Sequence, residues 1–293
     1  MLLIQYILDG LITGIIYGLT ALAFNIIYRA GGILNLAQGH LVCVGAFFIW
    51  TAVSFFKLPL LLGIPLIVIC LVFMAIVTEL IVFRPLIGQN LFTITIATVA
   101  LMIILEGLMQ VIWGAAERPY PEFISMEPYI LGKVILTKTL IWAVIAAFLI
   151  VGGMHYFFSK TKWGLKLSAI AEDHIIAQSV GISVRTSIVT AWIISAFISA
   201  IVTIFFFNGA SFSFKSSSIG LRALPVALLG GMESIWGALL AGLIVGLGES
   251  FSAYYLDPFT EGIMSQAFPF IIMIVILLVR PQGLFGWKVI ERV

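Results

Sequence analysis

The sequence predicts an all-α, polytopic membrane protein, and three observations support that fold class. Of the 293 residues, 62% are hydrophobic and only 10% are charged, and the mean hydropathy is +1.21. Water-soluble domains carry about 25% charged residues, so a surface with this composition would aggregate in water. The hydrophobic stretches are unbroken runs, whereas the strands of a β-barrel would alternate over about ten residues. We therefore expect a transmembrane helical bundle that forms a single domain over residues 1–293.

A spanning helix needs about 20 mainly apolar residues, and eight hydrophobic segments are candidates. In chain order they are Leu2–Tyr28, Ile33–Phe56, Leu60–Phe83, Leu91–Trp113, Thr139–Phe158, Ser187–Phe207, Leu221–Glu249 and Ile263–Val279. The first lacks the basic residues that open an export signal, so we expect it to be a retained membrane helix.

Glycine pairs predict two interruptions, one near residues 29–45, where Gly31-Gly32 precedes the second segment, and one near residues 221–240, inside the seventh segment. In the second, a turn-back also returns the basic carboxyl tail to the side that holds most basic residues, as the positive-inside rule requires. Gly31-Gly32 and Gly230-Gly231 occupy corresponding places in the two halves. Paired interruptions of this kind point to a transport pathway, and chance similarity between glycine-rich helices is the alternative.

Two polar stretches predict loops on opposite sides of the membrane. Residues 114–138 contain three prolines and three glutamates and indicate a semi-rigid, extracytoplasmic loop. Residues 159–186 carry four basic residues, which places them in the cytoplasm. Their apolar residues Leu167, Ile170, Ala171, Ile175 and Val180 fall on one helical face, so a short helix outside the bilayer is expected there.

Polar residues inside the apolar segments allow two interpretations. Asn35, Gln38 and His40 lie beside Gly39, and either satisfy the interrupted backbone or line a permeation route. The ionisable residues within the segments are Asp9, Glu79, Glu106 and Glu249. Glu79, about one turn from Arg84, favours an interfacial ion pair or a snorkelling helix end, and Glu249 also favours an interfacial position. Asp9 and Glu106 either hydrogen-bond within the bundle or line a path.

Catalytic and cofactor motifs are not recognisable in the sequence. The three histidines share no zinc spacing, and no Gly-x-Ser-x-Gly elbow is present. The nearest approach to a phosphate loop, residues 209–216, has Phe214 where a glycine must be. The net charge of +2 indicates no nucleic-acid partner. We expect a non-enzymatic chain without cofactor or metal, so that any ATP is bound by another subunit.

The chain resembles the permease subunits of branched-chain amino acid ABC importers over nearly its whole length. Five short motifs in the family's order carry the resemblance: Asn35–His40, Arg84–Leu86, Ala171–Asp173 with Gly181-Ile182, Ala227–Met232 and Arg280–Gly286.

The resemblance implies a multi-pass protein of the bacterial inner membrane that works in a larger machine. A second permease subunit, identical or related, would complete the pathway, and two ATP-binding subunits would dock below. An extracytoplasmic solute-binding protein, periplasmic or a lipoprotein, would deliver branched-chain or other amino acids, or a related small polar solute.

It also implies roles for individual residues. The helix around residues 165–180 would be the coupling helix. Coupling to the ATPase would involve Gly164, Ala171, Glu172, Asp173 and Gly181. The translocation pathway would be lined by Asn35, Gln38, Gly39, His40, Thr95, Gly230, Gly231 and Glu233.

Some positions depart from the family pattern and leave the solute open. Glu233 stands where a small residue is usual, Trp236 where proline is common, and Ala97 replaces a glycine. The same family handles urea and short amides. The alternatives are an ion-coupled secondary transporter, which would need Asp9, Glu106 or Glu249, and a sugar-type ABC permease.

Overall fold

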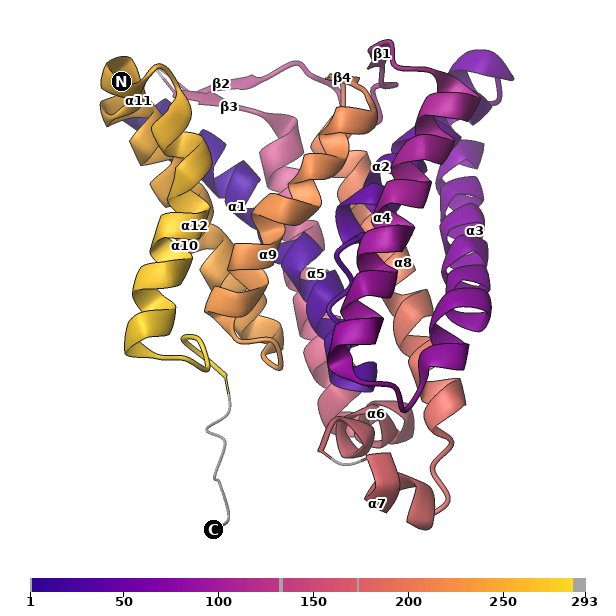
Figure 1. The fold of residues 1–293 in the computed structure, drawn as a ribbon. Coiled ribbons are helices and arrows are strands. Elements are labelled where there is room, and N and C mark those ends of the chain that lie inside the picture. Colours follow the sequence, from indigo (N-terminus) through magenta and orange to yellow (C-terminus); the bar gives the residue numbers. More distant parts are fainter. Residues whose placement is uncertain (1, 132–133, 173, 287–293) are drawn as a thin grey trace. The chain divides into compact units, whose positions relative to one another are not determined.

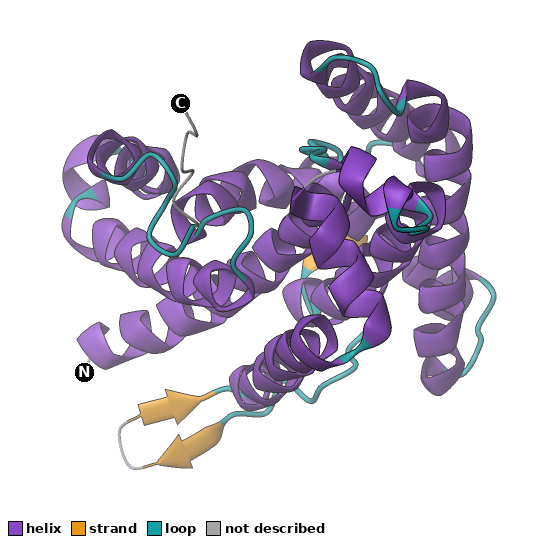
Figure 2. Ribbon diagram, turned by 90° about the horizontal axis from the view of Figure 1, so that it is seen from below, coloured by secondary structure: helices purple, strands orange, loops and turns teal. Residues whose placement is uncertain are grey.

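A computed structural model describes residues 2–131, 134–172 and 174–286 and confirms the predicted all-α membrane fold. In this part, seven helices are long and apolar enough to cross a membrane, and α12 adds a shorter apolar helix. The strands are short, and helices make up nearly all of the rest (Figure 2). The chain forms two compact units.

The first unit comprises residues up to 25, 124–152 and those from 222 onward. It contains most of α1 (Leu2–Gly31), the hairpin of β2 (Tyr129–Leu131) with β3 (Val134–Leu136), and the first part of α5 (Lys138–Lys160). It also holds most of α9 (Ile219–Gly230), α10 (Ile235–Tyr255), the single turn α11 (Asp257–Thr260) and α12 (Ile263–Val279). The β2–β3 hairpin pairs antiparallel, with Tyr129 opposite Leu136.

Glycines bring α1 and α10 into backbone contact in the first unit. A Cβ on Gly14 would lie 2.7 Å from the Gly242 carbonyl oxygen, and one on Gly246 would lie 2.3 Å from the Gly14 nitrogen. The spacing of Gly10, Gly14 and Gly18 places all three on one side of α1. Such small-residue seams replace the hydrophobic driving force that lipid cannot supply, because they permit close van der Waals packing.

The second unit comprises residues 26–123 and 153–221. Its long helices are α2 (Gln38–Trp50, continued by a π-helical turn to Phe55), α3 (Leu60–Thr78, continued likewise to Phe83), α4 (Leu91–Trp113) and α8 (Val184–Phe207). The short elements are a 3₁₀ turn at Arg84–Leu86, β1 (Arg118–Pro119), α6 (Lys162–Glu172), α7 (His174–Ser179), β4 (Ser211–Phe212) and a 3₁₀ turn at Phe214–Ser218.

Helix α8 is the centre of the second unit, because α2, α3 and the α6–α7 segment all pack against it. Trp192 of α8 is fully buried and stacks on Phe83, with ring centroids 4.9 Å apart. β1 pairs with β4 just after α8 ends, while α6 and α7 lie at its other end (Figure 1). Residues 114–123 and the α6–α7 segment, which the sequence predicts on opposite sides of the membrane, thus lie at opposite ends of α8.

Exposed apolar side chains on the long helices fit a lipid environment. On α4, Phe92 is 74% and Val111 83% exposed, and on α3 Leu61 is 80% exposed. A soluble protein does not expose contiguous apolar faces of this kind. The chain is therefore a multi-pass membrane protein.

Three expectations from the sequence are corrected. The cytoplasmic segment holds two short helices, α6 and α7, instead of one over residues 165–180, and the residue between them, Asp173, lies outside the described residues. Val180 follows α7 and is 69% exposed, so it is not on a buried face. Glu79 is fully buried inside a π-helical turn and, within the described part, forms no ion pair with Arg84.

Candidate functional site

The first helix interruption covers residues 32–37, between α1 and α2. Gly32 has a φ of +64°, a left-handed conformation that ends α1 and that glycine adopts without strain. The Asn35 Oδ1 atom accepts from the Ala37 backbone nitrogen at 3.3 Å, which closes a local turn. Its Nδ2 atom donates to Gln38 Oε1 at 3.2 Å. Asn35 therefore pairs with a backbone amide through its oxygen and with the Gln38 side chain through its nitrogen.

Helix α8 fixes Gln38 from the other side. Gln38 Nε2 donates to Ser199 Oγ at 2.6 Å, and Ser195 Oγ donates to Gln38 Oε1 at 3.2 Å. Asn35 and Gln38 are both 0% exposed. In a low-dielectric interior, an unpaired amide would cost about 1–3 kcal/mol, so this network holds the interrupted segment in one conformation.

Gly39 lies where two backbones cross. A Cβ at this position would lie 2.2 Å from the Ser217 carbonyl oxygen and 2.4 Å from the Gly220 nitrogen. Its neighbour His40 is 5% exposed, and its Nε2 lies 3.8 Å from Glu106 Oε2 on α4. Within the described residues neither imidazole nitrogen has a hydrogen-bond partner, so Glu106 is the nearest charged group that the ring meets.

The second interruption covers residues 231–234, between α9 and α10, and the chain reverses there (Figure 1). Gly231 has a φ of +89° directly after the helix end, as Gly32 does in the first interruption. Asn25 Nδ2 donates to the Gly231 and Ser234 carbonyl oxygens at 3.2 and 3.0 Å. Asn25 is 1% exposed, so a buried amide adds a second donor to two carbonyls of the reversal that also accept from the Ser234 and Ala238 backbone nitrogens.

The carboxyl-terminal motif packs into the same reversal. The Leu284 backbone nitrogen donates to the Leu229 carbonyl oxygen at 2.8 Å. A Cβ on Gly231 would lie 2.5 Å from the Gly286 nitrogen, and a Cβ on Gly283 would lie 2.5 Å from the Leu228 carbonyl oxygen. The glycines of this motif are therefore required by close backbone approach, and the tail seals the carboxyl end of α9.

Three other predicted pathway residues lie outside these networks. Thr95 is exposed on α4 and donates to the Leu91 carbonyl oxygen of its own helix at 2.8 Å. Gly230 is buried against Gly237, where a Cβ would lie 2.5 Å from the Gly237 oxygen. Glu233 is half-buried in the reversal itself. Their part in a pathway stays a prediction.

The residues predicted to couple to an ATPase lie in and beside α6 and α7. Gly164 packs against the end of α5, since a Cβ would lie 2.1 Å from the Phe157 carbonyl oxygen. Gly181 has open space around it but a φ of +81°, so its conformation is what favours glycine. Ala171 is half-buried and Glu172 ends α6, while Asp173 lies outside the described residues.

Helices α6 and α7 also present apolar side chains to the outside. Leu167 and Ile170 are buried at 1% and 0% exposure, whereas Leu165 is 56% and Ile176 64% exposed. Trp163 on α6 is 47% exposed and lies under the Lys166 ammonium, 5.0 Å from the ring centroid. Exposed apolar groups on a segment that the sequence places outside the bilayer are typical of surfaces that contact a protein or a membrane.

Arg29 ties the first interruption to α6, a connection that the sequence did not reveal. It lies in the last turn of α1, and its Nη2 atom donates to Ser168 Oγ at 2.9 Å. Its guanidinium lies over the Phe158 ring, 4.3 Å from the centroid. Arg29 is 8% exposed, so these contacts are sheltered from water. Arg29 thus links α6 directly to the residues that precede Gly31-Gly32.

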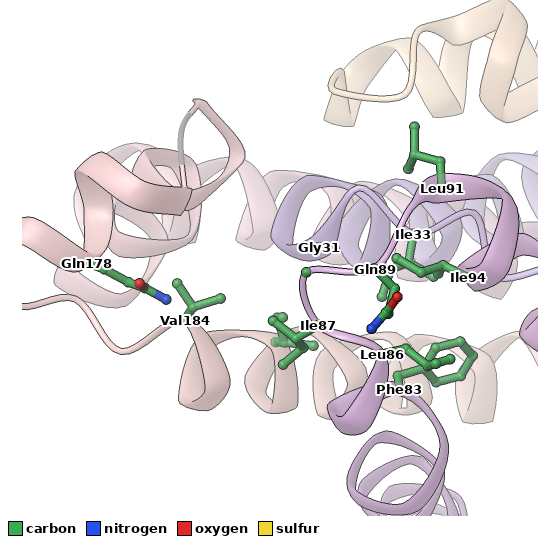
Figure 3. Close-up of a pocket in the computed structure, with 12 residues that line it drawn as sticks. Gly31, Ile33, Phe83, Leu86, Ile87, Gln89, Leu91, Ile94, Gln178 and Val184 are labelled. Atoms are coloured by element: carbon green, nitrogen blue, oxygen red, sulfur yellow. The ribbon is translucent and has the colours of Figure 1, made fainter.

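A cavity of about 350 Å³ lies within the second unit beside the first interruption. Figure 3 shows Ile33, Phe83 and Ile94 on its wall, with the amides of Gln89 and Gln178 as its polar groups. None of the residues that line it is ionisable. The cavity suits an uncharged, mainly apolar group.

Comparisons with known proteins agree on one family. A family model described as the permease component of branched-chain amino acid transport systems matches residues 6–277. The chain is 26% identical to the high-affinity branched-chain amino acid permease protein BraD of Pseudomonas aeruginosa, covering 99% of this chain and 98% of BraD. It is 26% identical to LivH of Escherichia coli (99% and 97% covered) and 28% identical to the probable LivH of Methanocaldococcus jannaschii (98% and 95%).

Replacing Gly39 by alanine is expected to destabilise the protein, because the new methyl group meets backbone atoms that cannot rotate away. Overpacking of this kind costs about 1–3 kcal/mol. Gly107→Ala on α4 is the matched control, since nothing lies within 4 Å of its Cβ position. Thermal unfolding in detergent should show a lower midpoint for Gly39→Ala alone. Equal midpoints for the two variants would show that the crossing is not tight.

Proposed function

The chain belongs to the family of permease components of branched-chain amino acid transport systems, and on this premise we propose that it forms part of a pathway for amino acids across the cell membrane. As a family member it is a non-enzymatic subunit that works with other components of an ABC importer. Branched-chain amino acids are the first candidate solutes, and other amino acids or a related small polar solute are the wider class.

The observation that carries the proposal is the α6–α7 segment with its exposed Leu165 and Ile176. A permease that binds no ATP can respond to ATP only through contacts with another subunit that differ between two states. Leu165 and Ile176 offer the apolar part of such a contact outside the spanning helices. Two subunits that bind ATP are the proposed partners at the α6–α7 segment.

The remaining partners follow from the same family architecture. A second permease subunit completes the pathway, and an extracytoplasmic solute-binding protein delivers the solute to the opposite side. The residues proposed to line the pathway as fixed walls are Asn35, Gln38, Gly39, His40, Thr95, Gly230, Gly231 and Glu233. Because the amides of Asn35 and Gln38 already bond each other and α8, their proposed role is to hold the wall and not to bind solute. The apolar cavity beside the first interruption supports a solute with an apolar side chain.

The coupling role is proposed for Gly164, Ala171, Glu172, Asp173 and Gly181, with Arg29 as the link to the pathway. Arg29 reaches from the last turn of α1 to Ser168 on α6. The proposed route from the ATP-binding subunits to the first interruption therefore runs through two contacts of Arg29, one charge-assisted hydrogen bond and one cation–π contact.

Replacing Leu165 and Ile176 together by aspartate is expected to abolish capture of the ATP-binding subunits, because two charges replace exposed apolar contacts. The control is Ile130→Asp with Ile135→Asp in the β2–β3 hairpin, where the side chains are also exposed, at 73% and 48%. Co-purification from cells that express all components measures the capture. Retained capture in the α6–α7 variant would reject this docking surface. Uptake by the chain alone, driven by an ion gradient in liposomes, would reject the importer itself.

Ser168→Ala is expected to loosen coupling, because it removes the hydroxyl that accepts from Arg29. Hydrogen bonds to charged groups contribute about 1.5–3 kcal/mol, so solute transported per ATP hydrolysed should fall by about tenfold or more. Ser179→Ala on α7 is the control, since its hydroxyl donates to its own helix at Ile176. Transport and ATP hydrolysis are measured together in proteoliposomes. An unchanged ratio for Ser168→Ala would remove Arg29 from the coupling route.

A further inference from the structure

Glu106 is a carboxylate within a membrane-spanning helix that the fold leaves partly exposed. Helix α4 runs from Leu91 to Trp113, and Glu106 lies four residues past Met102, the middle of the helix, which is about 6 Å along the axis. The hydrocarbon core of a bilayer extends about 15 Å to either side of its centre. The Glu106 side chain is nevertheless 41% exposed. A carboxylate at this depth needs surroundings other than lipid tails.

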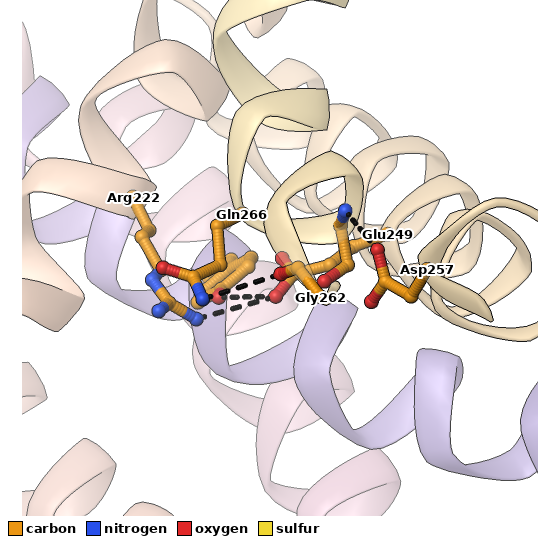
Figure 4. Close-up of polar contacts among 7 residues, drawn as sticks. Arg222, Glu249, Asp257, Gly262 and Gln266 are labelled. Carbon is orange, nitrogen blue, oxygen red and sulfur yellow. Dashed lines mark hydrogen bonds and ion pairs between the residues drawn. The ribbon is translucent and has the colours of Figure 1, made fainter. Parts of the chain in front are cut away.

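Glu249 shows how the same fold pairs a carboxylate in another spanning helix. Its Oε1 atom accepts from Tyr17 Oη and pairs with Arg222 Nη1, each at 3.3 Å (Figure 4). For Glu106 the recorded contact is with His40, whose Nε2 lies 3.8 Å from Glu106 Oε2, longer than a hydrogen bond. In the described part of the chain, no lysine or arginine forms an ion pair with Glu106.

His40 contacts the carboxylate from the interior of the second unit. The His40 residue is 5% exposed, on a helix, α2, that is buried along most of its length. Because the imidazole occupies the buried side of Glu106, the exposed part of the carboxylate faces away from the helices of this unit. Water is the surrounding that can solvate that part.

Glu106 also shares one side of α4 with other polar residues. Thr95, Glu106 and Gln110 are 11 and 4 residues apart, close to three turns and one turn of a helix, so they lie on the same side. Thr95 and Gln110 are both exposed. Ile104 and Val111, at 55% and 83% exposure, lie on the opposite side. The two exposed sides of α4 therefore differ in polarity, and the one with Glu106 does not suit lipid.

We propose that the side of α4 with Thr95, Glu106 and Gln110 lines a water-filled part of the solute route, and that Glu106 makes this part favour cations over anions. The inference deepens the proposed function, on which the identity of the solute rests. A fixed charge between low-dielectric walls acts strongly on ions that pass it. Glu106 thus repels anionic solutes, whereas a zwitterionic amino acid carries its own positive group. Glu106 is in this sense a specificity-determining residue.

Thiol labelling tests whether this side of α4 meets water. The native cysteines, Cys43 and Cys70, are first replaced by alanine. Glu106→Cys is then compared with Ile104→Cys, the matched control, which is exposed at nearly the same depth on the opposite side. The thiolate is the form that reacts, and lipid suppresses it, so a membrane-impermeant methanethiosulfonate should modify Glu106→Cys about tenfold faster or more.

The labelling uses the full-length chain in membranes of cells that express all components, as vesicles of both orientations, with mass spectrometry as the readout. Equal rates at the two positions, or no reaction of Glu106→Cys from either side, would overturn the proposal, because this side of α4 would then not line a route for water. Should Glu106→Cys not fold, Gln110→Cys, one turn away on the same side, replaces it with the same expectation.

The charge of Glu106 is tested at Gln110→Cys with two reagents of opposite charge, one with a trimethylammonium group and one with a sulfonate. A unit charge about 6 Å away changes their rates in opposite directions, so in water the cation-to-anion rate ratio should fall about tenfold in Glu106→Gln. Glu117→Gln is the matched control, because Glu117 is an exposed acid in the loop after α4, where solvent screens its charge. An unchanged ratio in Glu106→Gln would overturn the charge role.

Both measurements detect chemical modification and do not require transport. If Glu106→Cys is labelled as expected but the wild-type importer moves no amino acid, the proposed function is rejected and the water-filled route stands. If the wild type transports leucine but Glu106→Cys is labelled no faster than Ile104→Cys, the proposed function stands and this inference is rejected.

Discussion

Every interruption of a membrane helix must be satisfied from within the protein, because the bilayer core offers no water to free backbone groups. Both interruptions of this chain meet that requirement with a buried amide next to a left-handed glycine. Asn35 closes the first after Gly32, and Asn25 closes the second after Gly231. The remaining contacts around these segments, from α8 in one unit and from the carboxyl-terminal motif in the other, keep the amides in place.

Helix α1 contacts the second interruption and α6 through two polar residues that lie one turn apart near its end. Asn25 donates to the second interruption, and Arg29 donates to α6. A polar residue in a membrane helix is costly without a partner, so each of these side chains identifies a contact that the fold depends on. The same helix carries the glycine seam against α10 and the carboxylate of Asp9. Close helix packing and the two polar contacts thus involve different parts of one helix.

The sequence predicted the local features well, because hydrophobic length and glycine pairs report on single segments. It located the spanning helices within a few residues, and it located both interruptions. It could not identify the partners of Gln38, since Ser195 and Ser199 are far away in the chain and have no distinctive pattern. The Arg29–Ser168 contact and the split between α6 and α7 were missed for the same reason: both depend on tertiary packing. Arg29 had one usable signal, a charge directly before a glycine pair at the end of an apolar segment.

Hydrogen exchange of the backbone amides at residues 32–37 and 231–234 tests the central claim most directly, with the protein in lipid nanodiscs. We expect these amides to exchange as slowly as those of the adjacent ends of α1 and α10, because fixed side chains and neighbouring backbone shelter both segments. Rapid exchange at the two interruptions beside slow exchange in the flanking helices would contradict it, since the segments would then be open to water and not held by Asn25, Asn35 and Gln38.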